Sequence, residues 1–577
     1  MSIARRGSTL FIIGGVSLGA ALACSGTGTG SSIGTGGGTA TGGGPGTGGF
    51  AGTPGSSGTP GVGGSTGTGG GGFDFDAGGN TGGTGGGTAV EINPKTCAEA
   101  EQAKSYVGCD FWPTVVANNV WSIFDYAVIV ANAGDADAEV TIERAGQTFT
   151  GTVPSNGLKK FYLPWVSELK GPDSNECGVA TPLSATVNAA GGAYHLTSTL
   201  PVTVYQFNAL EYQPSGGEAG KDWSSCPGNL RCADNGNTPI GCFSYSNDAS
   251  LLLPTQVLTG NYRITGQKGW PAVSMGSYFA ITATEDATSV TVSVSATGQI
   301  VAGGGIPATP KNGTAKFTMN QGDVVQVLGS ADGDLSGSLV QADKPIQVIH
   351  GVPCTQQPIG TQACDHIEES VFPAETLGQH YFVVPPTGPA GNAPGHIVRI
   401  YGNVNGTKLT YPGFKPPKAP DMINAGQVVD MGRVNNPFEI VGDHEFAVGS
   451  FMLGGAILSP LQGLGDPAAS SSTAVEQYRS KYVFLAPDDY PTSYVDVVMP
   501  AGANVLVDGM AVPAATAISS NFGISRVKLG PGAQGAHLLI SDKPVGIQVM
   551  GYGKYTSYQY PGGSNLQAIA PPPPPPK

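Results

Sequence analysis

Acidic and imidazole side chains are concentrated in one short segment that contains Asp365, His366, Glu368 and Glu369. Clustered carboxylate oxygens are the ligands that hard cations prefer, so these residues form a candidate site for a cation or a cationic ligand. The same side chains could instead cap a following turn or pair with nearby basic residues. No cofactor is predicted, and calcium is the one cation that the segment suggests.

Beyond residue 90, side chains for catalysis are not arranged in any recognisable motif. The seven histidines include no His-x-x-x-His pair and no HExxH motif, which argues against a zinc hydrolase. Ser246–Asp248 precedes an apolar stretch and is interpreted as a turn that leads into a buried strand. Phe111, Trp112 and Trp121 could line a sugar-binding face, although such residues more often fill a core. No catalytic residue is predicted, and we do not expect an enzyme.

Eight cysteines lie beyond residue 90, and an even number in an exported chain indicates disulfides. A zinc site would need paired Cys-x-x-Cys spacing, which is missing. The expected local pairs are Cys97 with Cys109 and Cys354 with Cys364. Each disulfide would close a short loop and stabilise the fold by about 3 kcal/mol. Three further cysteines lie in one insertion, namely Cys226, Cys232 and Cys242. They are expected to share Cys177 as a partner.

The amino terminus has the pattern of an export signal over residues 1–23. A basic pair precedes the apolar segment Leu10–Ala23, which is too short to span a bilayer comfortably. Cys24 follows at once, and the segment resembles the lipobox of bacterial lipoproteins. Acylation of Cys24 would anchor the chain to a bacterial outer membrane or cell surface, whereas ordinary cleavage at the same bond would release a secreted protein.

The amino-acid composition changes near residue 90, which divides the chain into a predicted stalk and a predicted folded body. Residues 24–90 are rich in Gly, Thr and Ser and cannot bury enough apolar surface to fold, so they are expected to form a disordered stalk behind the lipid anchor. The whole chain has a net charge of -14 and no basic stripe, which argues against nucleic acid as a partner.

The body, residues 91–566, has the pattern of an all-β protein. Val290, Val292 and Val294 alternate with polar residues, as in a half-buried strand, while Tyr126–Ala131 is continuously apolar and predicts a strand covered on both faces. The one modest helical candidate is Ala474–Lys481. Residues 567–577 are a Pro-rich tail that should adopt extended polyproline II and stay solvated.

A repeated pattern divides this body. An apolar strand, a polar turn and a second apolar strand recur four times, each time after an upstream pair of strands. We interpret them as four diverged β-sandwich-like modules with disulfide-closed insertions, and a propeller-like arrangement is the alternative. The modules lie near residues 120–260, 275–380, 395–465 and 490–560.

Several motifs appear together in a recognisable order. They are Gly108–Trp112, Val202–Asn208, Ser246–Pro254, Ala342–Pro345, Cys364–Glu369 and Glu476–Arg479. In this order they resemble the amino-terminal domain family of IgGFc-binding proteins, over roughly Pro94 to Tyr560. The resemblance implies an extracellular binding or adhesion module, not Fc binding in particular, and it brings no catalytic residues.

These observations lead to one expected function and two alternatives. We expect a lipid-anchored surface protein that binds an extracellular protein or glycan, without catalysis and with membrane contact only through its anchor. The alternatives are a secreted carbohydrate-active enzyme and a structural envelope protein without a dedicated ligand.

Overall fold

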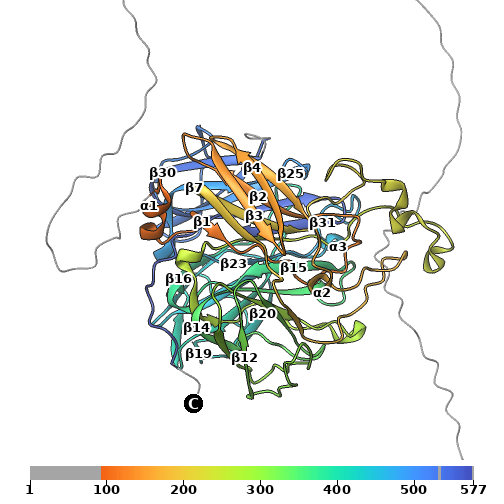
Figure 1. Cartoon of the computed structure of the whole chain (residues 1–577). Coiled ribbons are helices and arrows are strands. Elements are labelled where there is room, and N and C mark those ends of the chain that lie inside the picture. Colours follow the sequence, from red (N-terminus) through yellow and green to blue (C-terminus); the bar gives the residue numbers. More distant parts are fainter. Residues whose placement is uncertain (1–92, 531–534, 575–577) are drawn as a thin grey trace, which may run out of the picture. The chain divides into compact units, whose positions relative to one another are not determined.

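The computed structural model describes residues 93–530 and 535–574, and it is built almost entirely from β-strands (Figure 1). The predicted signal peptide, Cys24 and the stalk lie outside the described residues. The all-β prediction is confirmed. The α-helices in the described ranges are short, namely α1 (Cys97–Ala103), α2 (Ser167–Lys170) and α3 (Gly455–Leu458). Among the described helices, none has the length and apolar character that crossing a bilayer requires.

Each module contributes one antiparallel sheet of four strands in the same spatial order, which we call its blade. In the first two modules, from the inner to the outer strand, the blades are β8 (Ala249–Leu251), β7 (His195–Asn208), β2 (Tyr126–Asn132) and β5 (Gly157–Leu163), then β15 (Asp365–Ser370), β14 (Leu339–Thr355), β10 (Tyr278–Ala283) and β13 (Val324–Leu328). In the last two they are β23 (Ala469–Ser471), β22 (Phe446–Phe451), β17 (His396–Gly402) and β20 (Val428–Val434), then β31 (Thr556–Pro561), β30 (Ala536–Gly553), β25 (Thr492–Pro500) and β29 (Phe522–Lys528).

A second sheet, the cover sheet, extends from each blade because the long strand takes part in both. In β7, for example, residues 195–198 pair with a cover strand and residues 203–208 pair with β2. In the third module the long strand is interrupted, and β21 (Phe438–Gly442) and β22 belong to separate sheets. The other cover strands are β1 (Gly108–Phe111), β3 (Ala138–Arg144), β4 (Gln147–Val153), β9 (Thr259–Arg263), β11 (Thr288–Ser293), β12 (Thr314–Met319), β16 (His380–Val383), β18 (Thr407–Thr410), β19 (Met422–Ile423), β24 (Arg479–Leu485), β26 (Val505–Val507) and β27 (Met510–Ala511).

The four inner strands close a ring. The first of them, β8, packs against β15 and β31, and the opposite one, β23, packs against the same two neighbours. The molecule therefore combines both predicted arrangements, because each module is a two-sheet unit and the four blades surround one axis as in a propeller.

Strands buried on both faces hold the blades together. Every residue of β2 is buried, as its continuous apolar sequence predicted. Val128 and Val130 belong to the core inside the first module and toward the second, while Ala127 and Ile129 face the core shared with the fourth module. Successive side chains point to opposite faces of a strand, so one apolar run fills two cores.

Two local predictions fail. The helix predicted over Ala474–Lys481 is wrong, since only a 3₁₀ turn (Val475–Gln477) forms before β24 begins at Arg479. Pairing of β24 with the long strand β30 outweighs the weak helical preference of this segment. The Pro-rich tail is not wholly solvated, because Pro573 is buried and its carbonyl accepts a hydrogen bond from Gln341 Nε2 at 3.3 Å.

Candidate functional site

Four loops meet at one end of the ring axis and form a surface that we call the rim. Each loop connects the long strand of a module to its inner strand, so all four emerge at the same end. They are loop 1 (209–248), loop 2 (356–364), loop 3 (452–468) and loop 4 (554–555). The large insertion of loop 1 lies at the right of Figure 1, near the labels α3 and β31.

Loop 3 is bound to the loops on both of its sides. The Gly454 N–H donates to the Gln357 carbonyl of loop 2 at 2.7 Å, and the Tyr555 N–H of loop 4 donates to the Gly463 carbonyl at 2.7 Å. Backbone hydrogen bonds of this kind fix the relative position of neighbouring loops.

Loop 1 completes the circle. Its Asn247 N–H donates to Oδ1 of Asp365, the first residue after loop 2, at 2.6 Å. On its other side, the Lys554 ammonium of loop 4 lies 4.9 Å from the centre of the Phe243 ring and 5.2 Å from that of Tyr555. The rim is therefore a continuous surface to which every module contributes.

Disulfides are concentrated at this rim. Cys226–Cys242 closes part of loop 1, Cys177–Cys232 ties that loop to the segment before β6, and Cys354–Cys364 encloses loop 2. The fourth bond, Cys97–Cys109, joins α1 to β1. Among the three cysteines of the insertion, the structure thus places Cys232 opposite Cys177. Cross-links of this kind limit the conformations open to long surface loops.

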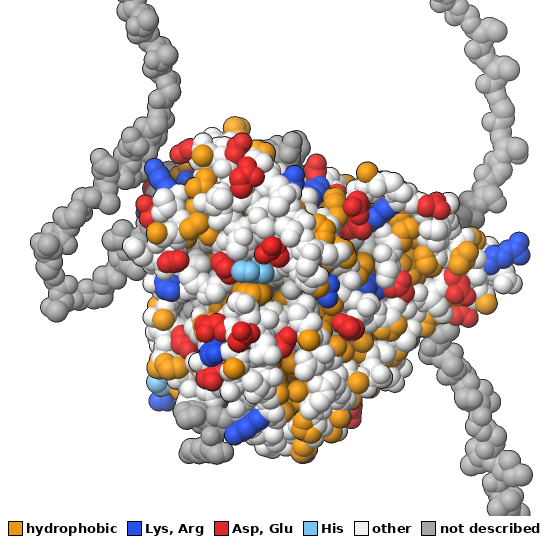
Figure 2. Space-filling model, viewed as in Figure 1, with side chains coloured by type: hydrophobic (Ala, Val, Ile, Leu, Met, Phe, Trp, Pro, Cys, Tyr) orange, Lys and Arg blue, Asp and Glu red, His pale blue; other side chains and the backbone are white. Residues whose placement is uncertain are grey.

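Large apolar side chains project from three of the four rim loops. Leu230 of loop 1 is 58% exposed, Ile359 of loop 2 is 49% exposed and Leu461 of loop 3 is 98% exposed. Phe111, Trp112 and Trp121, by contrast, are buried in cores and do not line a sugar-binding face. Figure 2 shows acidic and basic side chains interspersed on the face in view, without a continuous basic patch there.

One carboxylate lies on the axis beneath the rim. Asp248 Oδ1 accepts the N–H groups of Ala249 and Gln559, at 2.9 and 3.3 Å. Its Oδ2 accepts those of Ala469 and Glu368, at 2.8 and 3.1 Å. These four donors occupy equivalent positions on β8, β31, β23 and β15, so Asp248 joins all four modules.

Other carboxylates continue this arrangement along the axis. Asp365 Oδ1 accepts the N–H groups of Asn247 and His366, at 2.6 and 2.8 Å. Glu369 Oε1 accepts the Ser370 N–H at 2.8 Å, and its carboxylate also accepts from the Leu251 backbone. The inner edge of each blade presents backbone N–H groups that have no further strand to pair with, and buried carboxylates supply the missing acceptors.

Glu368 links the first module to the second. Its Oε1 accepts hydrogen bonds from Ser250 Oγ at 2.9 Å and Gln206 Nε2 at 3.2 Å. Its Oε2 accepts from Asn208 Nδ2 at 2.5 Å and lies 3.2 Å from His366 Nε2.

The structure therefore places the predicted cation-site residues inside the molecule. Asp365, His366, Glu368 and Glu369 are all 0% exposed, and the axis and the boundary between modules use them as hydrogen-bonding groups. Over the described ranges, no three His, Cys, Asp or Glu side chains are grouped closely enough to hold a metal ion. Their hydrogen-bond partners are mainly backbone N–H groups and the side chains of Gln206, Asn208 and Ser250, rather than the basic residues of the alternative.

Burial raises the pKa values of several acidic side chains on the axis and in the loops. It raises the pKa of Asp248 and Glu369, although the backbone donors act in the opposite direction. Burial also raises the pKa of Asp365, and repulsion from Asp466 of loop 3 adds to the effect. The pKa of Asp466 itself is raised by burial to about 7. In loop 1, burial and the neighbouring Asp125 raise the pKa of Glu211 to about 8.

Sequence reasoning did not identify Asp248 as a central residue. It predicted a turn before a buried strand, which is correct for Ala249–Leu251, but it assigned no partner to the carboxylate. A weak signal was present in the sequence, because an aspartate lies at the start of an inner strand or within three residues before it in three modules, at Asp248, Asp365 and Asp466.

Comparison with known proteins agrees with this architecture. The family model described as IgGFc binding protein matches residues 248–551, from the axial aspartate to the long strand of the fourth module. The human IgGFc-binding protein is 31% identical over 136 residues, which are 24% of this chain and 2% of that protein. This chain thus matches only a small part of the human relative. Because the family model covers more than half of its length, the chain belongs to the IgGFc-binding protein family.

Proposed function

We propose that this chain is an extracellular binding protein that captures a protein ligand at the rim, without catalysis. The observation that carries the proposal is the convergence of four loops on one surface, with three disulfides and exposed apolar side chains from three modules. Membership of a family named for binding supports the same conclusion.

The chemistry of the rim suits a protein partner. Protein interfaces gain much of their affinity from a few large side chains that become buried at the centre of the contact. Leu230, Ile359 and Leu461 are such anchors, and each is held on a different loop. Cross-linked loops lose little conformational entropy on binding, which leaves more of the contact energy for affinity.

We further propose that the protein acts at a bacterial cell surface. Cys24 would be acylated and residues 24–90 would form the stalk, which suits an adhesion role because the rim could then reach partners away from the membrane. Labelling cells with a palmitate analogue tests the anchor. Label should be incorporated into the natural protein and be absent from Cys24→Ser, and label that persists in the variant would remove the anchoring proposal.

The ligand can be sought with protein and glycan arrays and with the Fc fragment of IgG, since the human relative is named for Fc binding. We expect the mature chain to retain a protein from these sets. Leu461→Asp, Ile359→Asp and Leu230→Asp should each weaken that binding at least tenfold. Phe414→Asp is the matched control, because Phe414 is also exposed but lies in the third module between β18 and β19, away from the rim.

Different outcomes separate the alternatives. A retained protein whose affinity is unaffected by all three rim substitutions would place the binding surface elsewhere. Absence of any ligand would favour a structural envelope protein. Turnover of a polysaccharide would favour a carbohydrate-active enzyme.

A further inference from the structure

Lys554 is the one charged side chain that loops 2, 3 and 4 expose. These three loops contain two charged residues, Lys554 and Asp466, and Asp466 is buried whereas Lys554 is exposed. The whole chain is acidic, with a net charge of -14. An exposed cation at the rim is therefore a local departure from the charge of the molecule, and it favours an anionic group of a partner.

Aromatic rings hold the Lys554 ammonium in place. It lies over the rings of Phe243 of loop 1 and Tyr555 of loop 4, and the partial negative charge of the ring faces attracts it. These two rings are nearly perpendicular, with centroids 5.3 Å apart, and the Tyr245 ring packs 5.7 Å from Phe243 and 5.4 Å from Tyr555. A side chain held in this way loses less conformational entropy when a partner binds it.

Lys554 takes part in none of the ion pairs found among the described residues. Three other lysines that lie over an aromatic ring each bind an aspartate, at 2.5 to 2.6 Å. The pairs are Lys170 with Asp173, Lys221 with Asp125 and Lys415 with Asp421. Lys159, over Phe161, forms no such pair either, but it lies on β5 and not in a rim loop. Because Lys221 belongs to loop 1, its partners show how an ammonium of this kind binds a carboxylate at the rim.

Leu461 lies close to Lys554 along loop 3. The backbone of Lys554 forms an antiparallel bridge with Leu464, three residues beyond Leu461. The next residue, Tyr555, donates its N–H to the Gly463 carbonyl at 2.7 Å. The 98% exposed side chain of Leu461 therefore projects from the same short segment that fixes the lysine.

Leu230 lies on the other side of Lys554, in loop 1. The Gly241 N–H donates to the Gly228 carbonyl at 3.0 Å, so the segment that leads to Leu230 runs beside the segment that leads to Phe243. A disulfide two residues beyond Leu230 ties the same segment to the residues before β6 (Val187–Ala189). Lys554 thus connects the segments that carry two of the three exposed apolar anchors.

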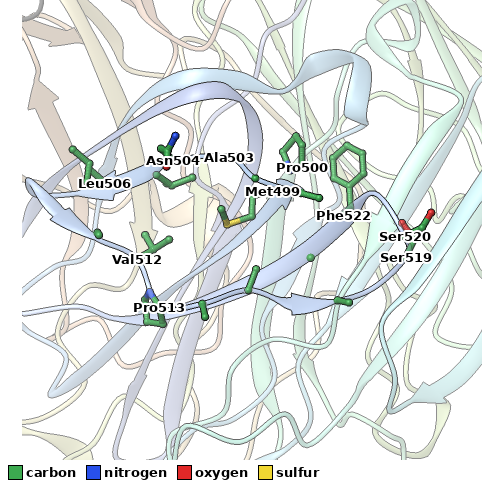
Figure 3. A pocket seen from close by; sticks show the side chains of 18 residues that line it. Met499, Pro500, Ala503, Asn504, Leu506, Val512, Pro513, Ser519, Ser520 and Phe522 are labelled. Atoms are coloured by element: carbon green, nitrogen blue, oxygen red, sulfur yellow. The ribbon is translucent and has the colours of Figure 1, made fainter.

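A second apolar area of the molecule differs from the rim in its charge. A groove of about 490 Å³ at the outer edge of the fourth module is lined by 18 residues, all uncharged, with Met499, Val512 and Phe522 around its opening (Figure 3). A partner bound there would contact uncharged lining residues. The groove therefore provides a control that separates binding by apolar contact from recognition of a charge.

We propose that the rim recognises a segment of the protein ligand in which an aspartate or glutamate lies beside large apolar side chains. This inference rests on the proposed function and names the chemistry of its ligand. The carboxylate would bind the Lys554 ammonium, as Asp125 binds Lys221, and the apolar side chains would bury Leu461 and Leu230. A charge between apolar anchors also orients the partner, because it must bring its carboxylate to the lysine.

Random twelve-residue peptides displayed on phage and panned on the mature chain test this proposal. We expect enriched sequences to share an acidic residue next to bulky apolar residues. In fluorescence anisotropy with the synthetic, carboxyl-amidated peptides, Lys554→Gln should weaken binding about tenfold and remove most of its salt dependence. Lys554→Arg should keep binding within about threefold, because a guanidinium also lies on aromatic faces and pairs with carboxylates. Lys159→Gln, the matched control outside the rim loops, should change binding less than about twofold.

A double-mutant cycle tests the contact itself. Replacing the acidic residue of the peptide by its amide should weaken binding to the natural chain as much as Lys554→Gln does. The same replacement should have little further effect on binding to Lys554→Gln, because the two groups act as one pair. Losses that simply add, or enriched peptides without an acidic residue, would overturn the proposal.

Rim and groove variants distinguish failure of this proposal from failure of the proposed function. Weaker peptide binding to Leu461→Asp with unchanged binding to Lys554→Gln would keep the rim as the binding surface and overturn the carboxylate proposal. Loss of binding only in Val512→Asp would assign the peptides to the groove and overturn it as well. An unchanged melting temperature shows that Lys554→Gln is folded. Failure to enrich any peptide would also overturn the proposal, while the protein arrays still test the proposed function.

Discussion

The axis and the rim distribute polar and apolar side chains in opposite ways. On the axis, Asp248, Asp365 and Glu369 are fully buried, whereas at the rim Leu230 and Leu461 point into solvent. The two regions lie at successive levels of the same ring, and loop 1 contributes to both through Asp248 and Leu230. Each arrangement is costly in isolation, since buried carboxylates lose hydration and exposed apolar groups order water.

This difference between the axis and the rim reflects a different physical requirement in each region. The inner strands end their blades at the axis, so their N–H groups need acceptors, and a carboxylate supplies more acceptor positions than any neutral side chain of its size. At the rim, backbone hydrogen bonds join loop 3 to loops 2 and 4, while Leu230, Ile359 and Leu461 remain exposed. We therefore attribute the buried acidic side chains to architecture and the exposed apolar groups to binding.

Removal of the axial carboxylate should have the largest effect. Asp248→Ala leaves four backbone N–H groups of four modules without an acceptor. We expect a loss of roughly 3–5 kcal/mol in the free energy of unfolding, because several buried N–H groups lose their acceptor at once. Guanidinium unfolding followed by tryptophan fluorescence measures it.

Two further variants serve as an intermediate case and as a surface control for this experiment. Asp248→Asn keeps one carbonyl acceptor and should fall between the natural protein and Asp248→Ala. Asp332→Ala removes an exposed aspartate and should change stability by less than about 0.5 kcal/mol. A loss below about 1 kcal/mol for Asp248→Ala would show that the inner strands do not depend on this carboxylate.

Two disulfides of similar loop length provide the next comparison. Cys226–Cys242 spans 16 residues at the rim, and Cys97–Cys109 spans 12 residues away from it. Loop-closure entropy predicts that replacing either pair with serine costs about 3 kcal/mol. Only the Cys226→Ser/Cys242→Ser protein should gain protease cleavage sites within loop 1, as mass spectrometry of the fragments would reveal. Equal cleavage of loop 1 in both proteins would mean that this bond does not order the rim.

Stability should decrease as the pH rises from about 5 to 8. Burial raises the pKa of Asp466 to about 7, so between its ordinary range and pH 7 the folded protein holds a proton that the unfolded chain has lost. The folded state then loses about 1.4 kcal/mol per pH unit for each such group. Glu211, with a pKa raised to about 8, acts in the same direction. Denaturant midpoints at several pH values measure the slope, and Asp466→Asn should flatten it. Stability that increases over this range would contradict the buried protonated state.

Much of the fold could be predicted from the sequence, because periodicity records burial. The alternation of Val290 and Val292 and the continuous run of Tyr126–Ala131 reported their faces correctly. The order of the repeats indicated four modules, but the ring depends on contacts between strands more than one hundred residues apart, such as β8 and β31. The spacing of the repeats in the sequence does not indicate such contacts.

The acidic segment shows the same limit for a site. Its residue types suggested a cation, since carboxylates on a surface and carboxylates beside an unpaired strand edge look alike in sequence. Glu368 acts between modules only because Asn208 and Ser250 are brought to it by another module. The apolar anchors Leu230 and Ile359 gave no signal at all, because a single leucine or isoleucine in a loop is common in any sequence.

The smallest expected effect concerns the stability of the rim variants. Leu461 is 98% exposed, so Leu461→Asp removes almost no buried area and should change the free energy of unfolding by less than about 0.5 kcal/mol. Met510→Asp, at another apolar site that is 73% exposed and lies on β27 outside the rim, serves as the control and should behave alike in unfolding experiments. A loss of more than about 1 kcal/mol for Leu461→Asp alone would show that this leucine packs within the protein. Unchanged stability together with weakened ligand binding would assign the side chain to recognition, as the contrast with the axis requires.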